Sequence, residues 1–454
     1  MGIYDRVRRS ALTAICACSI VSGIGMMASP GIALAKEKCA AITGAGSSLQ
    51  ATQQGKWVKE GVEERKFEVC EPERPGIKYL SVGSGAGLKA VGIPGGALEK
   101  VEGKSIAYAG TDDAPTATQL GSTEAEKAGG TNLETVPTVA APVSVIAHLP
   151  KECEPEGKEF VIPNKVLNEL WLSKYANWSA FLKAAKITFK EEATKCTAAI
   201  KLEVRSDGSG TSFAFKQYLS QIEKKPWEEG VKNYVTDEAI WPEEEGKEEK
   251  NREIKHKHKA ETVENKGSGG VVAAVSEELG SVGYVNLANA AEAVPAFTAY
   301  KENEKEEKFW AKIQNNGTEV TVKSAEPVKG TKEGNCPSTL TAAQEAALPK
   351  GTTNPPVWSG FHLATSKTAV TTVYPICTLT YDLGWNKYKT ANLITYFGSE
   401  AAAVEAGRTV AAYFTYMVGT GAGKGQGEIA SYYAPLPTKV DTVAKETVSS
   451  FVAK

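Results

Sequence analysis

Histidine is scarce in this sequence, and the motifs that hold metals or support common hydrolytic chemistry are missing. The 454 residues include four histidines and eight cysteines, with no C-x-x-C pair and no cysteine–histidine cluster. Zinc sites need such clusters, so we expect no metal. No serine stands in the G-x-S-x-G pattern of a nucleophile elbow, and no histidine lies beside a candidate serine. We therefore expect a protein that is not an enzyme and that uses no cofactor.

An excess of charge of one sign is also missing. The formal net charge is −2, and removal of the first 35 residues, with three arginines and one aspartate, changes it to about −4. Binding to a nucleic-acid backbone needs a concentrated basic surface, so no nucleic-acid partner is expected. A phosphate-binding nucleotide loop is absent too, because Gly421–Gly425 has Gly425 where Ser or Thr should follow the lysine. A small anion would have to be held by local donors.

Long apolar runs are confined to the N-terminus. Three arginines within the first nine residues precede an apolar stretch from Ala11 to Ala28, and Ala33-Leu34-Ala35 has the A-x-A pattern of a cleavage site. We interpret residues 1–35 as a signal peptide cleaved after Ala35, with export to the periplasm or the cell exterior. A membrane anchor is the alternative, but serines and glycines interrupt the run; Cys16 and Cys18 lie early in it, which disfavours lipidation. No later segment is apolar enough to span a bilayer.

Six cysteines follow the predicted cleavage site. An even number in an exported protein predicts disulfides, with fifteen possible pairings. Cys39 and Cys70 each lie just before a predicted strand, so these two are paired first. The remaining pairs are assigned as Cys153 with Cys196 and Cys336 with Cys377.

One stretch joins a predicted strand to a predicted helix through small polar residues, Arg205–Phe213 (RSDGSGTSF). Apolar residues alternate with polar ones from Ile200 to Val204, as in a half-buried strand, and recur at helical spacing from Phe215 to Ile222. The first turn of a helix offers unpaired N–H groups, and glycine lets an anion approach them closely. The guanidinium of Arg205 adds a planar donor fork. Ser or Thr at such a junction is more often a plain helix cap.

Two similar turns occur earlier in the chain. Thr43–Leu49 (TGAGSSL) and Val82–Gly87 (VGSGAG) each follow a short predicted strand. Three glycine turns with hydroxyl groups can together surround a small tetrahedral anion. A fourth strand, Ser105–Ala109, runs into Asp112 and Asp113. These acids can cap a helix, but a carboxylate among anion donors would accept the proton of hydrogen phosphate and repel sulfate, which has none.

The order of the elements indicates an α/β protein. Strand, glycine turn and helix repeat up to Pro150, and a second α/β unit follows, with an amphipathic helix over 166–181. Charged segments near 243–266 and 301–308 are expected to be solvated insertions. The tail is expected to form a strand and two helices, at 373–381, at 401–417 and up to Phe451.

Taken in order, these motifs resemble the substrate-binding proteins of phosphate ABC transporters, the PstS family. The specific match is R-x-D-G-S-G-T at Arg205–Thr211, within Val204–Leu219. The other matching pieces are individually weak and span nearly the whole mature chain: Ile42–Ser48, Val82–Gly87, Tyr108–Pro115, Pro137–Pro150, Leu167–Trp178, Gly267–Ala288, Tyr374–Tyr381 and YAPLP at 433–437.

The resemblance implies a type II periplasmic-binding-protein fold, in which two α/β domains are joined by two crossover strands and the ligand lies in the cleft between them. Domain I would comprise 36–140 and 376–454, and domain II would comprise 141–375 with the charged insertions. Such a protein, expected here as a monomer, would capture inorganic phosphate and deliver it to the permease and ATPase of an ABC transporter in the membrane.

The resemblance also implies phosphate-binding residues from both domains. Hydroxyl groups, backbone N–H groups, one guanidinium and one proton-accepting carboxylate would contribute, from Ser48, Leu49, Ser84, Asp113, Arg205, Ser209, Gly210 and Thr211. Asp207 would hold Arg205 in place.

This chain departs from the family pattern at several positions. Leu49-Gln50 stands where Phe-Pro is usual, and Ser268 where Asn is common. Alignment on Ala114-Pro115 selects Asp113 as the proton acceptor, whereas alignment on Gly-Thr-Asp selects Asp112, so both remain open. Two other functions also remain open: binding of another oxyanion by the same fold, or a role as a secreted phosphate sensor or surface interaction protein. A secreted phosphatase is disfavoured.

Overall fold

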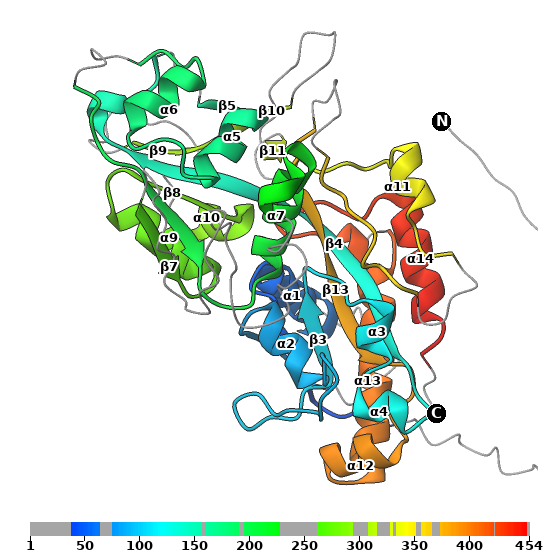
Figure 1. The fold of residues 1–454 in the computed structure, drawn as a ribbon. Coiled ribbons are helices and arrows are strands. Elements are labelled where there is room, and N and C mark those ends of the chain that lie inside the picture. Colours follow the sequence, from blue (N-terminus) through cyan, green and yellow to red (C-terminus); the bar gives the residue numbers. More distant parts are fainter. Residues whose placement is uncertain are drawn as a thin grey trace, which may run out of the picture. The chain divides into compact units, whose positions relative to one another are not determined.

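A mixed sheet of nine described strands forms the centre of the molecule, in the order β2-β1-β3-β13-β4-β8-β6-β7, with β9 paired to β4 (Figure 1). The computed structural model describes residues 38–63, 75–156, 160–189, 195–227, 261–293, 307–315, 327–329, 333–350, 356–365, 373–421 and 423–451. The chain from Lys38 onward is one compact unit. The predicted signal peptide lies outside the described residues. The strands of the sheet are β1 (Ile42–Gly46), β2 (Ile77–Ser81), β3 (Tyr108–Thr111), β4 (Leu133–Leu149), β6 (Lys201–Arg205), β7 (Glu261–Asn265), β8 (Ser281–Asn286), β9 (Glu307–Trp310) and β13 (Cys377–Trp385).

Two groups of parallel strands lie at the two ends of this order. Strand β1 pairs in parallel with β2 and β3, and β6 pairs in parallel with β7 and β8. In each group the carboxyl ends of neighbouring strands meet at one edge of the sheet, which is where open α/β sheets bind ligands. The glycine turns predicted from the sequence follow β1, β2 and β6, and Asp112 follows β3.

Two long strands connect the groups, and they run side by side in Figure 1. All 17 residues of β4 are buried. Strand β4 pairs with β13 from Leu133 to Pro142, and with β8 from Val143 to Ala147. A strand buried along its whole length reads as a near-continuous apolar run, which is what residues 138–149 show. The predicted α/β fold with two crossover strands is confirmed; the domain boundaries stay a prediction.

Helices cover both faces of the sheet, and two short β-ladders complete the fold. The ladders are β5 (Val161–Pro163) with β10 (Lys312–Gln314), and β11 (Val328–Lys329) with β12 (Glu333–Gly334). The helices are α1 (Ala51–Trp57), α2 (Ser84–Ala90), α3 (Ala117–Leu120), α4 (Glu124–Lys127), α5 (Asn164–Trp171), α6 (Trp178–Ala184), α7 (Gly210–Ile222), α9 (Gly267–Glu277), α10 (Leu287–Ala293), α11 (Ala342–Ala346), α12 (Ala391–Phe397), α13 (Glu400–Val418) and α14 (Thr438–Val448). A π-helical segment, Val58–Glu63, and 3₁₀ turns at Lys151–Cys153 and Gly425–Gly427 also occur.

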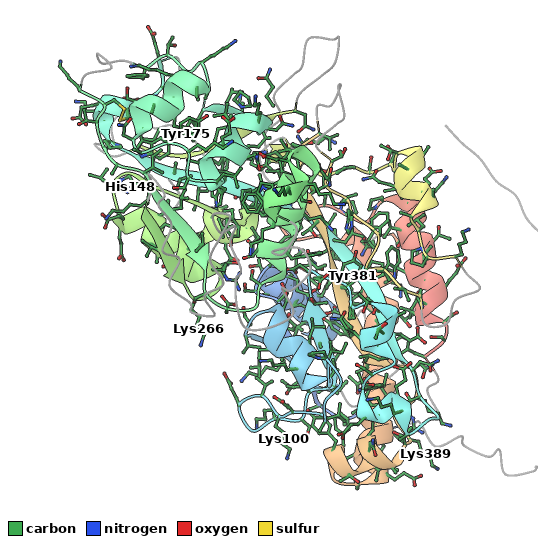
Figure 2. The ribbon with its side chains drawn as sticks, in the orientation of Figure 1. Lys100, His148, Tyr175, Lys266, Tyr381 and Lys389 are labelled. Carbon is green, nitrogen blue, oxygen red and sulfur yellow. A yellow bond between two sulfur atoms is a disulfide. The ribbon has the colours of Figure 1, made fainter. Side chains whose placement is uncertain are left out.

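Buried aromatic side chains account for much of the core. Phe215 of α7 stacks on Tyr284 of β8 with ring centroids 4.6 Å apart, and Trp171 of α5 packs edge-on against Phe215 at 4.8 Å. These contacts fix α7 against the sheet. Charged side chains lie at the surface instead: Lys100, Lys266 and Lys389 are exposed, whereas the aromatic Tyr381 is buried (Figure 2).

Several predicted boundaries are wrong by a few residues, for identifiable reasons. The helix predicted over 166–181 is two helices, α5 and α6, because the chain turns at Ser173, which has a positive φ of 54°. The strand predicted at 105–109 is β3, shifted toward the carboxyl end. Gly44 and Gly46 lie inside β1 rather than in the turn. A β-carbon at Gly44 would lie 2.1 Å from the Tyr108 ring, so glycine there serves close packing between strands.

Two of the three assigned disulfides are confirmed. Cys153 bonds to Cys196 and Cys336 to Cys377. Cys70 lies outside the described residues, so its pairing with Cys39 stays a prediction.

The predicted charged insertions lie mostly outside the described residues. Their described ends belong to the sheet: Glu261–Asn265 form β7, and residues 307–308 begin β9.

Candidate functional site

Arg205 ends β6, and 2% of its side-chain surface is exposed. Its Nε donates to Asp207 Oδ1 at 2.6 Å, and its Nη2 donates to Asp207 Oδ2. Asp207 also accepts a hydrogen bond from the backbone N–H of Gly267 at 2.9 Å. Burial raises the pKa of Asp207, but the hydrogen bonds and charge of Arg205 outweigh burial and leave this pKa below its usual value. The bidentate pair therefore fixes the plane of the guanidinium.

The remaining nitrogen of that guanidinium connects to the turn after β1. Arg205 Nη1 donates to Ser268 Oγ at 3.3 Å, and Ser268 Oγ lies 3.1 Å from Ser48 Oγ. Ser268 is in the first turn of α9 and is buried. Arg205, Ser268 and Ser48, which are far apart in the sequence, therefore form a continuous series of polar contacts.

The start of α7 approaches the turns after β2 and β3. Ser209 is the N-cap of α7, and its Oγ accepts a hydrogen bond from a backbone N–H of the first helical turn at 3.1 Å. A β-carbon at Gly210 would lie 2.7 Å from Asp112 Cβ and 2.8 Å from Ser84 Oγ. Glycine is required there because two segments approach the backbone so closely. Thr211 Oγ1 donates to Asp112 Oδ2 at 3.3 Å.

Ser84 opens α2 and is buried. The backbone N–H of Asp112 donates to Ser84 Oγ at 3.3 Å. Next to it, the N–H of Gly85 donates to the carbonyl oxygen of Gly208 at 3.0 Å. The first turn of α2 therefore contacts the turn that precedes α7.

Asp112 is the carboxylate at the centre of these contacts, and 3% of its surface is exposed. Its Oδ1 accepts a hydrogen bond from Ser47 Oγ at 2.5 Å, and its Oδ2 accepts one from Thr211 Oγ1. Burial raises the pKa of Asp112, while the Ser47 hydroxyl and the charge of Arg205 lower it, which leaves it at about 6. The ionised form therefore predominates at neutral pH. We call this group the donor cluster: Ser47, Ser48, Ser84, Asp112, Arg205, Thr211 and Ser268.

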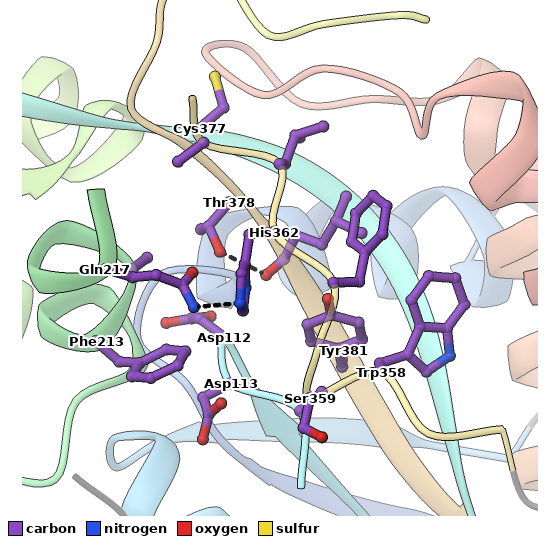
Figure 3. A pocket seen from close by; sticks show the side chains of 16 residues that line it. Asp112, Asp113, Phe213, Gln217, Trp358, Ser359, His362, Cys377, Thr378 and Tyr381 are labelled. Atoms are coloured by element: carbon purple, nitrogen blue, oxygen red, sulfur yellow. Dashed lines mark hydrogen bonds between the residues drawn. The ribbon is translucent and has the colours of Figure 1, made fainter. Parts of the chain in front are cut away.

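Asp113 lies outside the donor cluster, in a pocket that Asp112 also lines and that holds several aromatic side chains. Phe213 is on one side of this pocket, and Tyr381 and Trp358 are on the other (Figure 3). Asp113 is 3% exposed, and its Oδ2 has no hydrogen-bond partner among the described residues. Burial, and then the charge of Asp112, raise the pKa of Asp113 well above its usual value. We call this region the aromatic pocket.

A hydrogen bond closes another side of the aromatic pocket. Gln217 Nε2 lies 2.8 Å from His362 Nε2 (Figure 3). Burial lowers the pKa of His362 to about 4, so the ring is neutral at physiological pH and places no cation beside Asp113.

The sequence reasoning missed Ser47 and gave no role to Ser268. Both are buried hydroxyls with a partner in the donor cluster. Ser47 stands beside the predicted Ser48, and a signal for it was the pair of serines after Gly46. Among the predicted donors, the N–H of Leu49 is bonded to Ser47 Oγ at 3.0 Å, and Ser209 Oγ acts as the acceptor in the capping hydrogen bond of α7.

In the described ranges, histidine, cysteine and carboxylate side chains form no group of three or more that could hold a metal ion. Each helix in those ranges falls short of the length or the apolarity that a bilayer crossing requires.

Similarity to known proteins identifies the superfamily of this chain. A family model described as a PBP superfamily domain matches residues 33–337, more than half of the chain. The chain belongs to the PBP superfamily. Within this superfamily it is similar to the phosphate-binding protein PstS of Pasteurella multocida, with 26% identity over 285 residues, which cover 63% of this chain and 64% of the relative. It is also similar to PstS of Xylella fastidiosa, with 28% identity over 208 residues, which cover 46% of this chain and 45% of the relative.

Solved structures of PBP proteins share the fold over a larger share of the chain. A human phosphate-binding apolipoprotein is 21% identical in sequence. The alignment covers 89% of this chain and 93% of that chain, with a TM-score of 0.55. The matches to the two PstS relatives cover less than two thirds of their length.

Proposed function

We propose that this PBP protein is an extracytoplasmic solute-binding protein that captures hydrogen phosphate in the donor cluster and delivers it to an ABC transporter. It carries out no reaction on the ligand. The proposed ligand contacts are the hydroxyls of Ser48, Ser84, Ser209 and Thr211, the backbone N–H groups of Leu49 and Gly210, the guanidinium of Arg205 and one carboxylate.

The observation that carries this proposal is the meeting of Arg205, Asp112 and the serine turns at the carboxyl ends of both groups of parallel strands. One fixed cation, several neutral donors and one carboxylate together fit a small oxyanion that bears a proton. Hydrogen bonds to charged groups contribute about 1.5–3 kcal/mol each. A micromolar affinity needs about −8 kcal/mol, so a handful of such bonds suffices after the cost of closing the cleft.

The geometry favours Asp112 over Asp113 as the acceptor of the ligand proton. Both carboxylates line the aromatic pocket, but Asp112 contacts Thr211 and Ser47 directly and lies within the field of Arg205. Asp113 Oδ2 has no hydrogen-bond partner among the described residues. On binding, hydrogen phosphate would replace the hydroxyls that now donate to Asp112. Sulfate carries no proton at neutral pH, so it would be repelled by the same carboxylate.

The direct test is calorimetry at pH 7.5 with phosphate, arsenate, sulfate and molybdate. We expect one-to-one binding of phosphate and arsenate, and much weaker binding of sulfate. No heat with phosphate would refute the proposal. Preference for sulfate or molybdate would assign the same fold to another oxyanion.

Export and delivery need tests of their own. The proposed signal peptide predicts a mature chain that begins at Lys36, which N-terminal sequencing of the exported protein would check. Delivery predicts that cells lacking the gene take up phosphate more slowly at low external concentration. Normal uptake with intact phosphate binding would favour a secreted phosphate sensor.

A further inference from the structure

A buried chain of hydrogen bonds leads from the donor cluster into the sheet and ends at Asp382 of β13. The carbonyl oxygen of Ser47 accepts from Tyr79 Oη at 2.9 Å, and Tyr79 Oη accepts from Gln50 Nε2 at 3.2 Å. Gln50 Nε2 also donates to Asp382 Oδ1 at 2.9 Å. On its other side, Ser47 donates to Asp112 through its hydroxyl. One continuous path therefore links the two carboxylates.

Asp382 is fully buried and is held by two amides of one helix. Gln50 is the N-cap residue of α1, and Gln54 lies one turn later on the same face. Gln54 Nε2 donates to Asp382 Oδ2 at 2.7 Å, so each carboxylate oxygen has its own amide donor. The start of α1, which directly follows the Ser47–Leu49 turn, is thereby tied to β13.

Two tyrosines fix the orientation of the second amide. Tyr108 Oη and Tyr413 Oη donate to Gln54 Oε1 at 3.0 Å and 2.8 Å, so its Nε2 must face Asp382. Glycine at position 110 leaves room for the path, since a β-carbon there would lie 1.9 Å from Gln50 Nε2. The two amides and Asp382 are fully buried and Tyr79 is half-buried. Each member has a partner, which is the condition for a polar network to specify one geometry.

The backbone of the Ser47–Leu49 turn is held by side chains at its other carbonyls as well. Asn286 Nδ2 lies 3.4 Å from Ser48 O and 3.3 Å from Leu49 O, and Tyr433 Oη donates to Leu49 O. Because side chains hold all three carbonyls, a shift in one of these partners would displace the turn that carries the hydroxyls of Ser47 and Ser48.

We propose that Asp382 is a positioning residue for the anion site: through Gln50 and Tyr79 it sets the place of the Ser47–Leu49 turn and so the affinity for phosphate. The inference rests on the proposed function. Asp382 touches no ligand in this proposal, and its effect passes through hydrogen bonds to the turn.

The first test removes the link nearest the turn. Tyr79→Phe deletes the hydroxyl that donates to Ser47 O, and we expect phosphate affinity to fall about fivefold with little change in Tm. Tyr388→Phe is the matched control, because Tyr388 Oη donates to the backbone carbonyl of Ala107 at 2.5 Å and lies outside the chain of hydrogen bonds that joins Asp382 to Ser47. It should leave the affinity unchanged.

The second test asks whether Asp382 acts through Tyr79. Asp382→Asn removes one of the two carboxylate oxygens that accept from Gln50 and Gln54, and we expect phosphate affinity to fall about thirtyfold. In this background, Tyr79→Phe should cost less than twofold, because the path is already broken. A fivefold loss of affinity on Tyr79→Phe in both the unaltered protein and Asp382→Asn would overturn the inference. Unchanged affinity in Tyr79→Phe alone would also overturn it, and that result does not require a stable Asp382→Asn protein.

The outcome separates this inference from the function on which it rests. If the unaltered protein binds no phosphate, the proposed function fails and this inference fails with it. If the unaltered protein binds phosphate and Tyr79→Phe binds equally well, this inference alone fails.

Discussion

Asp112 and Asp113 are neighbours in the chain and both line the aromatic pocket, yet their carboxylates have different hydrogen-bond partners. Asp112 is in the donor cluster, where two hydroxyls donate to it and Arg205 supplies positive charge. Asp113 is in the aromatic pocket, where its Oδ2 has no partner among the described residues. The two carboxyls are equally buried but differ in their donors, and the pKa of Asp113 is raised further. Burial by itself therefore does not distinguish the two carboxyls; their hydrogen-bond donors do.

The largest effect is expected from the cation of the donor cluster. Arg205→Lys keeps the charge but loses the planar fork, and we expect phosphate affinity to fall about a hundredfold. Arg408→Lys, on α13, is the control and should bind phosphate normally. Calorimetry measures both. If Arg205→Lys binds phosphate as tightly as Arg408→Lys does, Arg205 does not contact the ligand and the donor cluster is not the phosphate site.

The comparison itself is tested by changing each aspartate. Asp112→Asn is expected to weaken phosphate binding about fivefold and to strengthen sulfate binding, because the repelling charge is gone. Asp113→Asn should leave both affinities within about twofold. Titrations with both anions at pH 7.5 decide between them. The reverse pattern would make Asp113 the proton acceptor.

Asp113→Asn, which should have little effect on binding, should change the thermal stability of the protein. The pKa of Asp113 is raised in the folded protein, so above its ordinary value of 3.8 the unfolded chain releases a proton that the folded chain retains, and stability falls as pH rises. We expect Asp113→Asn to raise the Tm by about 2 °C or more at pH 7.5 and to leave it unchanged near pH 3.5. Thermal melts at both pH values would check this. A Tm gain that is the same at both would point to packing instead.

The smallest effect is expected from a single neutral donor of the donor cluster. Thr211→Val keeps the shape of the side chain and removes one hydroxyl, so phosphate affinity should fall about threefold to fivefold. Thr409→Val removes a buried hydroxyl that donates to the carbonyl of Ala40, away from the site, and serves as the control. A larger loss in the control than in Thr211→Val would contradict the assignment.

The fold and most of the donor cluster could be predicted from the sequence. The alternation before Arg205 and the helical spacing after it place the Arg205–Thr211 turn at the end of a strand, where it is found. The two crossover strands followed from the resemblance. These features depend on local patterns of apolar residues, or on a motif long enough to be specific.

The choice between adjacent residues could not be made in this way. Whether Ser47 joins Ser48 in the cluster, and whether Asp112 or Asp113 does, depends on where β1 and β3 end. Their ends are set by tertiary contact, since a β-carbon at Gly46 would lie 1.9 Å from the carbonyl oxygen of Gly110. A shift of one residue reverses the face on which a side chain lies, so an error of one position in a strand end changes the site.

The position of β13 has a consequence for the synthesis of this protein. Thr138 and Thr380, whose hydroxyls lie 2.8 Å apart, are separated by 242 residues. Strand β13 lies between β3 and β4 in the sheet. The edges of β3 and β4 that pair with β13 therefore stay unpaired until most of the chain has been synthesised. Fragments that stop before Cys377 would lack the strand that closes this gap, and they would be exposed to edge-to-edge association.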